Sequence, residues 1–325
     1  MSHRSLQLVT LCIGTLLMAV KFIAWWLTNS NAVLSDASES IINITAGVFA
    51  FYSLGLAAKP RDSNHPYGHG KIEFLSAGFE GGLIFLAGIG IVIKAGYNIV
   101  YPQSIQHLDI GVYLTVFSGA VNYVMGRLLE RRGRLASSMT LIASGKHLKS
   151  DAWSSLGLVI GLLIVTFTQI PVLDSVVAAI FGLVILFTGF QLMRKSVAGI
   201  MDEADYHLIE QMVQVLDEHR RPTWIDVHNF RVIKYGATLH IDCHITVPWY
   251  FSTRDSHGEV KAFENLVVEK NELPVELFVH VDPCEPPVSC SICQKMDCEV
   301  RAAPFSHHIT WKLDNIMADK KHTPS

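Results

Sequence analysis

The sequence predicts an α-helical membrane protein that ends in a small soluble α+β domain. Composition is the first reason, because 50% of the 325 residues are hydrophobic and only 17% are charged, against about 25% charged in average globular proteins. The second is that long apolar runs fill residues 6–200, whereas residues 203–325 resemble an ordinary soluble chain. The expected domains are a six-helix membrane domain at 1–202, an α+β domain at 203–283 and a Cys/His-rich tail at 284–325.

Hydropathy places six membrane-spanning helices in the first domain, each close to the roughly 20 residues that a bilayer requires. The expected spans are 6–28, 33–56, 76–98, 110–130, 148–170 and 174–194. The first span carries no small-residue cleavage pattern, so we expect it to remain in the protein as a membrane helix.

Lysine and arginine are distributed unequally between the loops. They gather between spans two and three, between spans four and five, and after span six, whereas the loops near Asn29, Pro102 and Pro171 carry none. Positively charged short loops stay on the cytoplasmic side. We therefore expect an integral protein of the inner or plasma membrane, in contact with lipid, with both termini in the cytoplasm.

Residues 203–283 show helix and strand patterns in the order αββαβ. The expected elements are helices at 206–218 and 255–271 and strands at 225–233, 238–247 and 275–281. Apolar and polar residues alternate along the second strand, as they do in a half-exposed strand. The pattern predicts a sandwich of one sheet and two helices, with Gly236 at the first turn.

Two similar polar segments, SDASES at 35–40 and SDAWSS at 150–155, interrupt the apolar runs. An ionisable residue in lipid costs at least about 2.5–3.5 kcal/mol on insertion scales, so these segments require a functional reason. Asp36 and Ser40 share one helix face, and so do His147 and Asp151, because each pair is four residues apart. If the two helices pack, the side chains form a transition-metal site. A polar helix contact or a metal-free proton relay is the alternative.

Two further groups of candidate metal ligands lie outside the spans. The loop DSNHPYGHGK holds Asp62, His65 and His69, with Gly68 and Gly70 to let the backbone turn; the alternative is a solvated loop. Ten of the fifteen histidines follow residue 203, and this density favours metal binding. The candidates there are His228, His244, His257, His280 and Asp282.

The tail contains four of the six cysteines, Cys284, Cys290, Cys293 and Cys298, followed by two adjacent histidines. A CxxC pair is a good thiolate chelator, although the full spacing matches no standard zinc finger. A disulfide is not expected in the reducing cytosol. A metal-binding tail is therefore predicted, with a redox-active or unused thiol cluster as the alternative.

These motifs together resemble the cation diffusion facilitator family, the six-helix divalent-metal/proton antiporters, over roughly residues 6–283. The resemblance rests on LSDASESIIN, HPYGHGK, KHLKSDAWSS and VHVDPC in this order. The resemblance implies a transport site at Asp36, His147 and Asp151. This chain departs from the family pattern at Ser40, where the family commonly has a carboxylate or an imidazole. The remaining implied groups are a loop site at Asp62, His65 and His69, a dimer-stabilising site at His228, His244, His257, His280 and Asp282, and a charge interlock of Lys71 with Asp202.

The expected function is proton-coupled export of a divalent transition metal by a homodimer. Zinc is the first choice, as cargo and as structural or regulatory ligand, while iron, manganese, cobalt, nickel and cadmium share these ligand types. The alternatives are a metal-sensing membrane regulator without transport and a membrane metalloenzyme. No HExxH motif occurs, so we expect no enzyme, and we expect no nucleic-acid partner.

Overall fold

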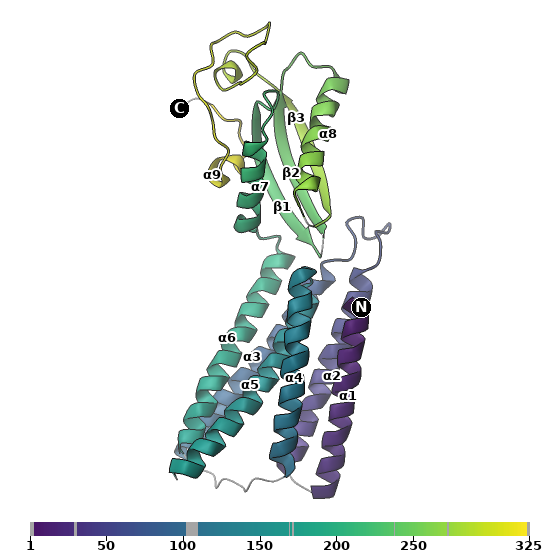
Figure 1. The fold of residues 1–325 in the computed structure, drawn as a ribbon, viewed down its shortest axis with the longest axis vertical. Helices are drawn as coiled ribbons and strands as arrows, with labels where there is room; N and C mark the ends of the chain where they lie inside the picture. The colour runs from purple at the N-terminus through teal and green to yellow at the C-terminus, as the bar shows by residue number, and fades with distance from the viewer. Residues whose placement is uncertain are drawn as a thin grey trace. The chain divides into compact units, whose positions relative to one another are not determined.

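The chain divides into two compact units, Met1–Met201 and Asp202–Ser325, and each unit has its own buried core. A computed structural model describes residues 3–28, 31–101, 110–168, 170, 172–236, 238–271 and 273–323. Figure 1 shows helices alone in the first unit and a sheet with helices alongside it in the second.

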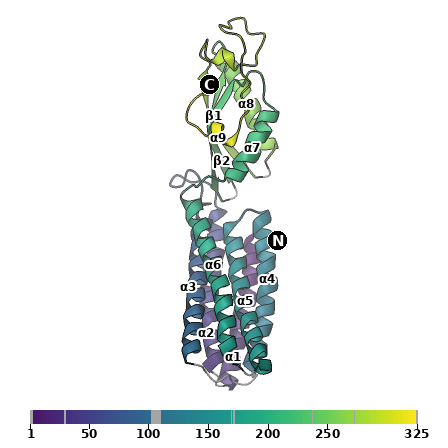
Figure 2. The same cartoon turned by 90° about the vertical axis from the view of Figure 1, so that its left-hand side faces the viewer.

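The first unit is a bundle of six helices, each 26 to 30 residues long. Their bounds are α1 His3–Thr28, α2 Asn31–Ala57, α3 Ile72–Val100, α4 Ile110–Leu135, α5 Met139–Thr168 and α6 Val172–Ile200. At a rise of 1.5 Å per residue each helix is about 40 Å long, which exceeds the roughly 30 Å of a bilayer's hydrocarbon core. The six run side by side in both views (Figures 1 and 2).

Four of these helices are apolar enough to cross a membrane by length and composition alone. The qualifying stretches are His3–Ile23, Ser40–Ala57, Ile72–Val100 and Ser175–Ile200. In the described part of the chain, α4 and α5 do not qualify, so the prediction of six spans is supported only in part. Helix α4 ends in a basic run, and α5 combines a charged and polar first half with an apolar second half.

Helix α5 begins earlier than hydropathy predicts. The expected fifth span starts at residue 148, but α5 starts at Met139, and His147 and Asp151 therefore lie well inside the helix. The polar side chains of this first half turn into the bundle, where Ser144 is 6% and His147 7% exposed. Hydropathy scores each residue as if it faced lipid, and it therefore ends a helix where an inward polar face begins.

Glycines let α3 and α6 lie against each other along their lengths. A Cβ atom on Gly88 would lie only 2.6 Å from the backbone nitrogen of Leu186, and one on Gly189 only 2.5 Å from that of Phe85. Lipid provides little hydrophobic force between helices, so this close contact supplies the packing. The buried side chains that pack beside it are Ala77, Ile84, Ala143, Ile185 and Leu192.

The second unit is a three-stranded sheet that packs against two helices. Its elements are α7 Tyr206–Glu218, β1 Asp226–Tyr235, β2 Thr238–Val247, α8 Thr253–Glu269, β3 Val275–Pro283, the 3-10 helix η1 Ser289–Ser291 and α9 Leu313–Ile316. The central strand β2 pairs antiparallel with β1 and parallel with β3. The predicted order αββαβ is thus confirmed, with bounds that differ by at most two residues.

The alternation along β2 divides the sheet into an apolar and a polar face. Ile241 and Ile245 are fully buried among residues of α7 and α8, whereas His240 and His244 belong to the polar register. Gly236, at φ +60°, provides the left-handed residue of the turn between β1 and β2. The tail also contributes to the apolar core, through Trp311 at 2% exposure.

We expect Gly88→Val to destabilise the helix bundle by about 1–3 kcal/mol, the usual cost of overpacking a tight contact. Gly90→Val is the matched control, because a Cβ at Gly90 meets nothing within 4 Å. Thermal unfolding of the purified protein in detergent measures both. Equal melting temperatures for the two variants would contradict the close α3–α6 contact.

Candidate metal sites

A hydrogen-bonded set of side chains links α2 and α5 inside the helix bundle. The amide nitrogen of Asn43 donates to Oδ2 of Asp151 at 2.7 Å, and Nε2 of His147 lies 2.9 Å from the amide oxygen of Asn43. His147 Nε2 and Asp151 Oδ2 are 3.9 Å apart. The predicted pairing of His147 with Asp151 on one helix face is therefore present, and Asn43 bridges the pair from α2.

The bridge requires a proton on one particular nitrogen of the His147 imidazole. The oxygen of the Asn43 side chain can only accept, so Nε2 of His147 carries the proton and donates. A metal ion needs an unprotonated ring nitrogen. Metal binding through Nε2 must therefore break this hydrogen bond, and the freed Asn43 oxygen then becomes available as a neutral ligand.

Ser40 lies one helical turn before Asn43 and is buried, at 9% exposure. It accepts a hydrogen bond of 3.3 Å from Nζ of Lys21 on α1. Lys21 thus places a cationic side chain at the Ser40 end of the candidate site. A bound metal cation there would be repelled by this side chain. The side chains of Asp36 and Glu39 lie outside the described part of the structure, so the placement of Asp36 as a ligand stays a prediction.

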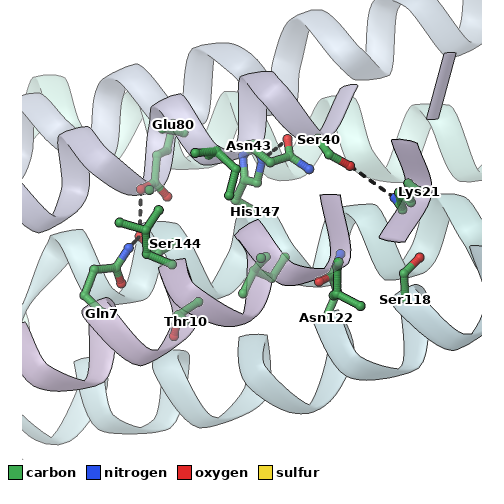
Figure 3. Close-up of a pocket in the computed structure, with 17 residues that line it drawn as sticks. Gln7, Thr10, Lys21, Ser40, Asn43, Glu80, Ser118, Asn122, Ser144 and His147 are labelled. Atoms are coloured by element: carbon green, nitrogen blue, oxygen red, sulfur yellow. Dashed lines mark hydrogen bonds between the residues drawn. The ribbon is translucent and has the colours of Figure 1, made fainter. Parts of the chain in front are cut away.

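A cavity of about 60 Å³ adjoins this set and is lined by residues of five helices (Figure 3). At its other end Ser144, one turn before His147, donates to Glu80 of α3 at 2.7 Å, and Gln7 of α1 donates to Ser144 at 3.3 Å. Glu80 is 1% exposed. Sequence reasoning missed Lys21 and Glu80, although an ionisable residue within a span is itself the signal.

The loop before α3 brings its three predicted ligands together. Asp62 Oδ1 lies 3.0 Å from Nδ1 of His65, and Asp62 Oδ2 lies 3.4 Å from Nε2 of His69. Gly68 adopts φ +90° at the turn between the histidines, whereas Gly70 has no positive φ. The hydrogen bond from His65 lowers the pKa of the Asp62 carboxyl, so the carboxylate remains ionised at neutral pH. The three ligand atoms lie within 4.8 Å of one another.

Three histidines form a row across the sheet of the second unit. His228 of β1 is in register with His244 of β2, which is in register with His280 of β3. Strands are about 4.8 Å apart, so residues in register meet, and the ring centroids of His228 and His244 are 5.0 Å apart. Asp282 lies 3.3 Å from His244 Nδ1, 3.7 Å from His228 Nε2 and 3.8 Å from His280 Nε2.

The next row across the sheet contains a carboxylate that sequence reasoning did not select. Asp226 is in register with Thr246, which is in register with Asp282. Burial alone would raise the pKa of Asp226, but hydrogen bonds from His228 and His322 hold it below its ordinary value. The signal was available, because Asp226 precedes His228 by two residues on one strand. His322 reaches the site only because the tail folds back, and sequence spacing does not reveal this.

Three other predicted site residues, His257, Lys71 and Asp202, do not lie in any of these clusters in the described structure. His257 is exposed on α8, a helix that packs on the apolar face of the sheet, and it makes no described contact with the histidine row. Lys71 caps the start of α3 and Asp202 follows α6 with φ +56°. These two residues belong to different units, so the charge interlock stays a prediction.

The four tail cysteines all line one small cavity, and no cysteine is in a disulfide. Burial raises the pKa of the thiols of Cys284 and Cys293. The CxxC spacing predicted that Cys290 and Cys293 form a thiolate pair. Cys284 and Cys298 line the same cavity as this pair.

A membrane helix bundle with an imidazole beside a carboxylate, followed by a sheet domain with a row of histidines, is an arrangement expected of a metal-cation transporter. The model of the cation efflux transmembrane domain matches residues 7–201, and that of the cation efflux protein cytoplasmic domain matches residues 204–284. The chain therefore belongs to the cation diffusion facilitator family, whose members transport divalent metal cations out of a compartment. It is an integral membrane protein.

Individual relatives match most of the chain. An uncharacterized transporter of Synechocystis sp. is 31% identical over 275 residues, which cover 84% of this chain and 87% of that protein. The manganese efflux system protein MneS of Bacillus subtilis is 26% identical and covers 86% of this chain and 94% of its own length. The cation-efflux pump FieF of Shewanella oneidensis is 23% identical, with 83% and 90% covered.

We expect His244→Ala to weaken zinc binding to the sheet by more than about tenfold, because even residues that only support a ligand cost 10–100-fold when lost. His244 is the central member of the row and contacts Asp282 directly. Calorimetric titration of the segment 202–325 with zinc measures this. His207→Ala, at an exposed position of α7, is the control. Unchanged affinity in the His244 variant would rule out the row as a metal site.

Proposed function

We propose that the chain exports a divalent transition metal from the cytoplasm in exchange for protons. The observation that carries the proposal is the partly buried, hydrogen-bonded set of Asn43, His147 and Asp151 on α2 and α5. In this mechanism the metal enters from the cytosol and binds His147 and Asp151 once they are deprotonated. The helices then turn the site outward, and protons displace the metal there.

Several features of the chain support this mechanism. An ion bound by direct ligands in a closed bundle suits alternating access, whereas a channel needs weak sites that release ions quickly. Glu80 and Ser144 line the same cavity as His147, and Glu80 offers a second carboxylate along the route of the ion or the proton. The Lys/Arg bias of the loops supports six spans with both termini in the cytoplasm. The match of residues 204–284 to a cytoplasmic family domain and the histidine row support a metal-responsive homodimer.

Zinc and manganese are the two cargoes that the ligand types favour. His147 suits zinc, which prefers nitrogen and sulfur ligands. Ser40 and Asn43 supply neutral oxygen atoms instead of a second imidazole, and oxygen ligands suit manganese. MneS and MneP of Bacillus subtilis are described as manganese efflux proteins. Competition between the two metals for uptake into proteoliposomes decides between them.

A metal-sensing regulator without transport is the second candidate, and the histidine row is the observation that favours it. It predicts metal binding to the sheet without metal flux. A membrane metalloenzyme has less support, because Asp151 and His147 are engaged by Asn43 within the bundle and neither is arranged around a nucleophile.

We expect Asp151→Ala and Asn43→Ala to abolish metal flux in sealed proteoliposomes under an imposed pH gradient. Asp151 supplies a charged ligand and Asn43 holds both ligands in place. Thr45→Val is the matched control, because Thr45 lies on α2 with its hydroxyl bonded to the carbonyl of Ile41 and its side chain is exposed. Circular dichroism and elution volume establish that each variant is folded. Flux at the wild-type rate in the Asp151 variant would contradict the transport site.

Metal affinity of the transmembrane site should fall as the pH drops below about 6.5, the ordinary pKa of histidine. The sign follows from competition, since a protonated imidazole cannot bind a metal and is fully charged at low pH. Titrations between pH 5.5 and 8 on protein truncated after Asp202 isolate this site from the sheet and the tail. A curve that is flat with pH would exclude His147 as a ligand.

A further inference from the structure

The tail beyond β3 is folded with very little regular secondary structure. Up to residue 323, where the described part of the tail ends, its regular elements are η1 and the four-residue α9. Residues 310–318 are secured by Trp311 and Ile316, which are buried in the main core. Residues 284–301 have a much smaller apolar cluster of their own, formed by Ile225, Ile292 and Cys293 with Cys284 and Ile309 beside them. Small loop-rich segments of this kind usually need a disulfide or a metal to stay folded.

All four cysteines of this segment line one cavity of about 20 Å³. A site of this size admits roughly one water-sized occupant, which suits a single ion. Cys290 and Cys293 are each only 7% exposed. Trp249 and Tyr250, which follow β2, also line it, so the cavity is formed by segments far apart in the sequence.

Hydrogen-bond donors point at the sulfur atoms. The backbone nitrogen of Trp249 donates to Sγ of Cys284 at 3.4 Å, and that of Ala302 donates to Sγ of Cys290 at 3.4 Å. The hydroxyl of Tyr250 donates to Sγ of Cys298 at 3.6 Å. A neutral thiol is a weak acceptor, whereas a thiolate gains more from such donors. Three of the four cysteines thus each receive a hydrogen bond at the sulfur atom.

Arg301 fixes the shape of the turn that carries the CxxC pair. Its guanidinium donates to the carbonyl oxygens of Cys290 at 2.8 Å, Cys293 at 2.9 Å and Lys295 at 2.9 Å. The planar fork of donors holds three successive points of the loop at once. The two cysteines are therefore positioned from behind by a residue that is not itself a ligand.

We propose that Cys284, Cys290, Cys293 and Cys298 bind one zinc ion as a tetrahedral thiolate site that holds the tail together. Four thiolates are a ligand set of structural zinc sites, with Zn–S distances of about 2.3 Å. Among the described residues no three of these Sγ atoms already lie within 4.8 Å of one another, so binding draws the sulfurs inward. Each thiol loses its proton as its bond to zinc forms, and no oxidant or reductant is needed.

The site is separate from the transport ligands and has a different role. It uses sulfur alone, whereas the intramembrane set offers nitrogen and oxygen. The tail that it stabilises continues to Lys321 and His322, which contact Asp282 and Asp226 in the row beside the histidines. Zinc bound by the thiolates therefore stabilises the segment that reaches the carboxylates beside the histidine row. Its role is structural, and it is not the transported ion.

The test uses full-length protein in detergent under reducing conditions, loaded with cobalt(II) as a spectroscopic substitute for zinc. We expect the intense sulfur-to-cobalt charge-transfer bands of a tetrathiolate in the wild-type protein. They should be lost in Cys290→Ser/Cys293→Ser and retained in Cys12→Ser, which changes an exposed cysteine of α1. Zinc content after dialysis against a zinc buffer should fall by one equivalent per chain in the double variant alone.

Wild-type protein without these bands would overturn the proposal, and this result does not depend on whether any variant folds. Equal zinc content in the wild type and the double variant would also overturn it, as would copper(I) binding to the four thiols to the exclusion of zinc. Proton-driven metal flux should persist in the double variant, because none of its changes touches α2 or α5. Failure of the thiolate site is thereby distinguished from failure of the transport site.

Discussion

The hydrogen bonds of Asn43 to His147 and Asp151 are the interaction on which the transport domain depends. They join α2 to α5 in a region where unpaired polar groups are costly. They also keep the two proposed metal ligands close together, so that the proposed mechanism needs little reorganisation when an ion binds. The same bonds occupy His147 and Asp151 in this structure, and in the proposed mechanism an ion competes with them as well as with protons.

A second constraint, strand register, organises the other domain. Because His228, His244 and His280 stand opposite one another on three adjacent strands, the sheet converts distant sequence positions into one cluster. Asp226 and Asp282 occupy the neighbouring row, and the tail brings His322 and Lys321 to them. Trp311 is buried in the main core, so the tail packs against the same core as the sheet that carries the cluster.

Sequence periodicity predicted features that lie within a single helix or strand. It did not predict contacts between side chains of different elements. The four-residue spacing of His147 and Asp151 and the alternation along β2 were both readable from the sequence. The start of α5 was not, because its inward polar face resembles a loop in a hydropathy window. Glu80 and Lys21 carried a readable signal that was overlooked, whereas the approach of His322 to Asp226 and the convergence of four thiols on one cavity are set by tertiary packing. The family resemblance grouped His257 with the histidine row; because α8 packs on the apolar face of the sheet, its role in that site stays a prediction.

The most direct measurement of the central claim is an anomalous-scattering map of the full-length protein crystallised with zinc or manganese at neutral pH. A metal between α2 and α5, within bonding distance of a ring nitrogen of His147 and a carboxylate oxygen of Asp151, is the predicted result. We further expect the Asn43 side chain to have left its position between them. Metal at the histidine row and the thiolates but none between α2 and α5 would contradict the transport site.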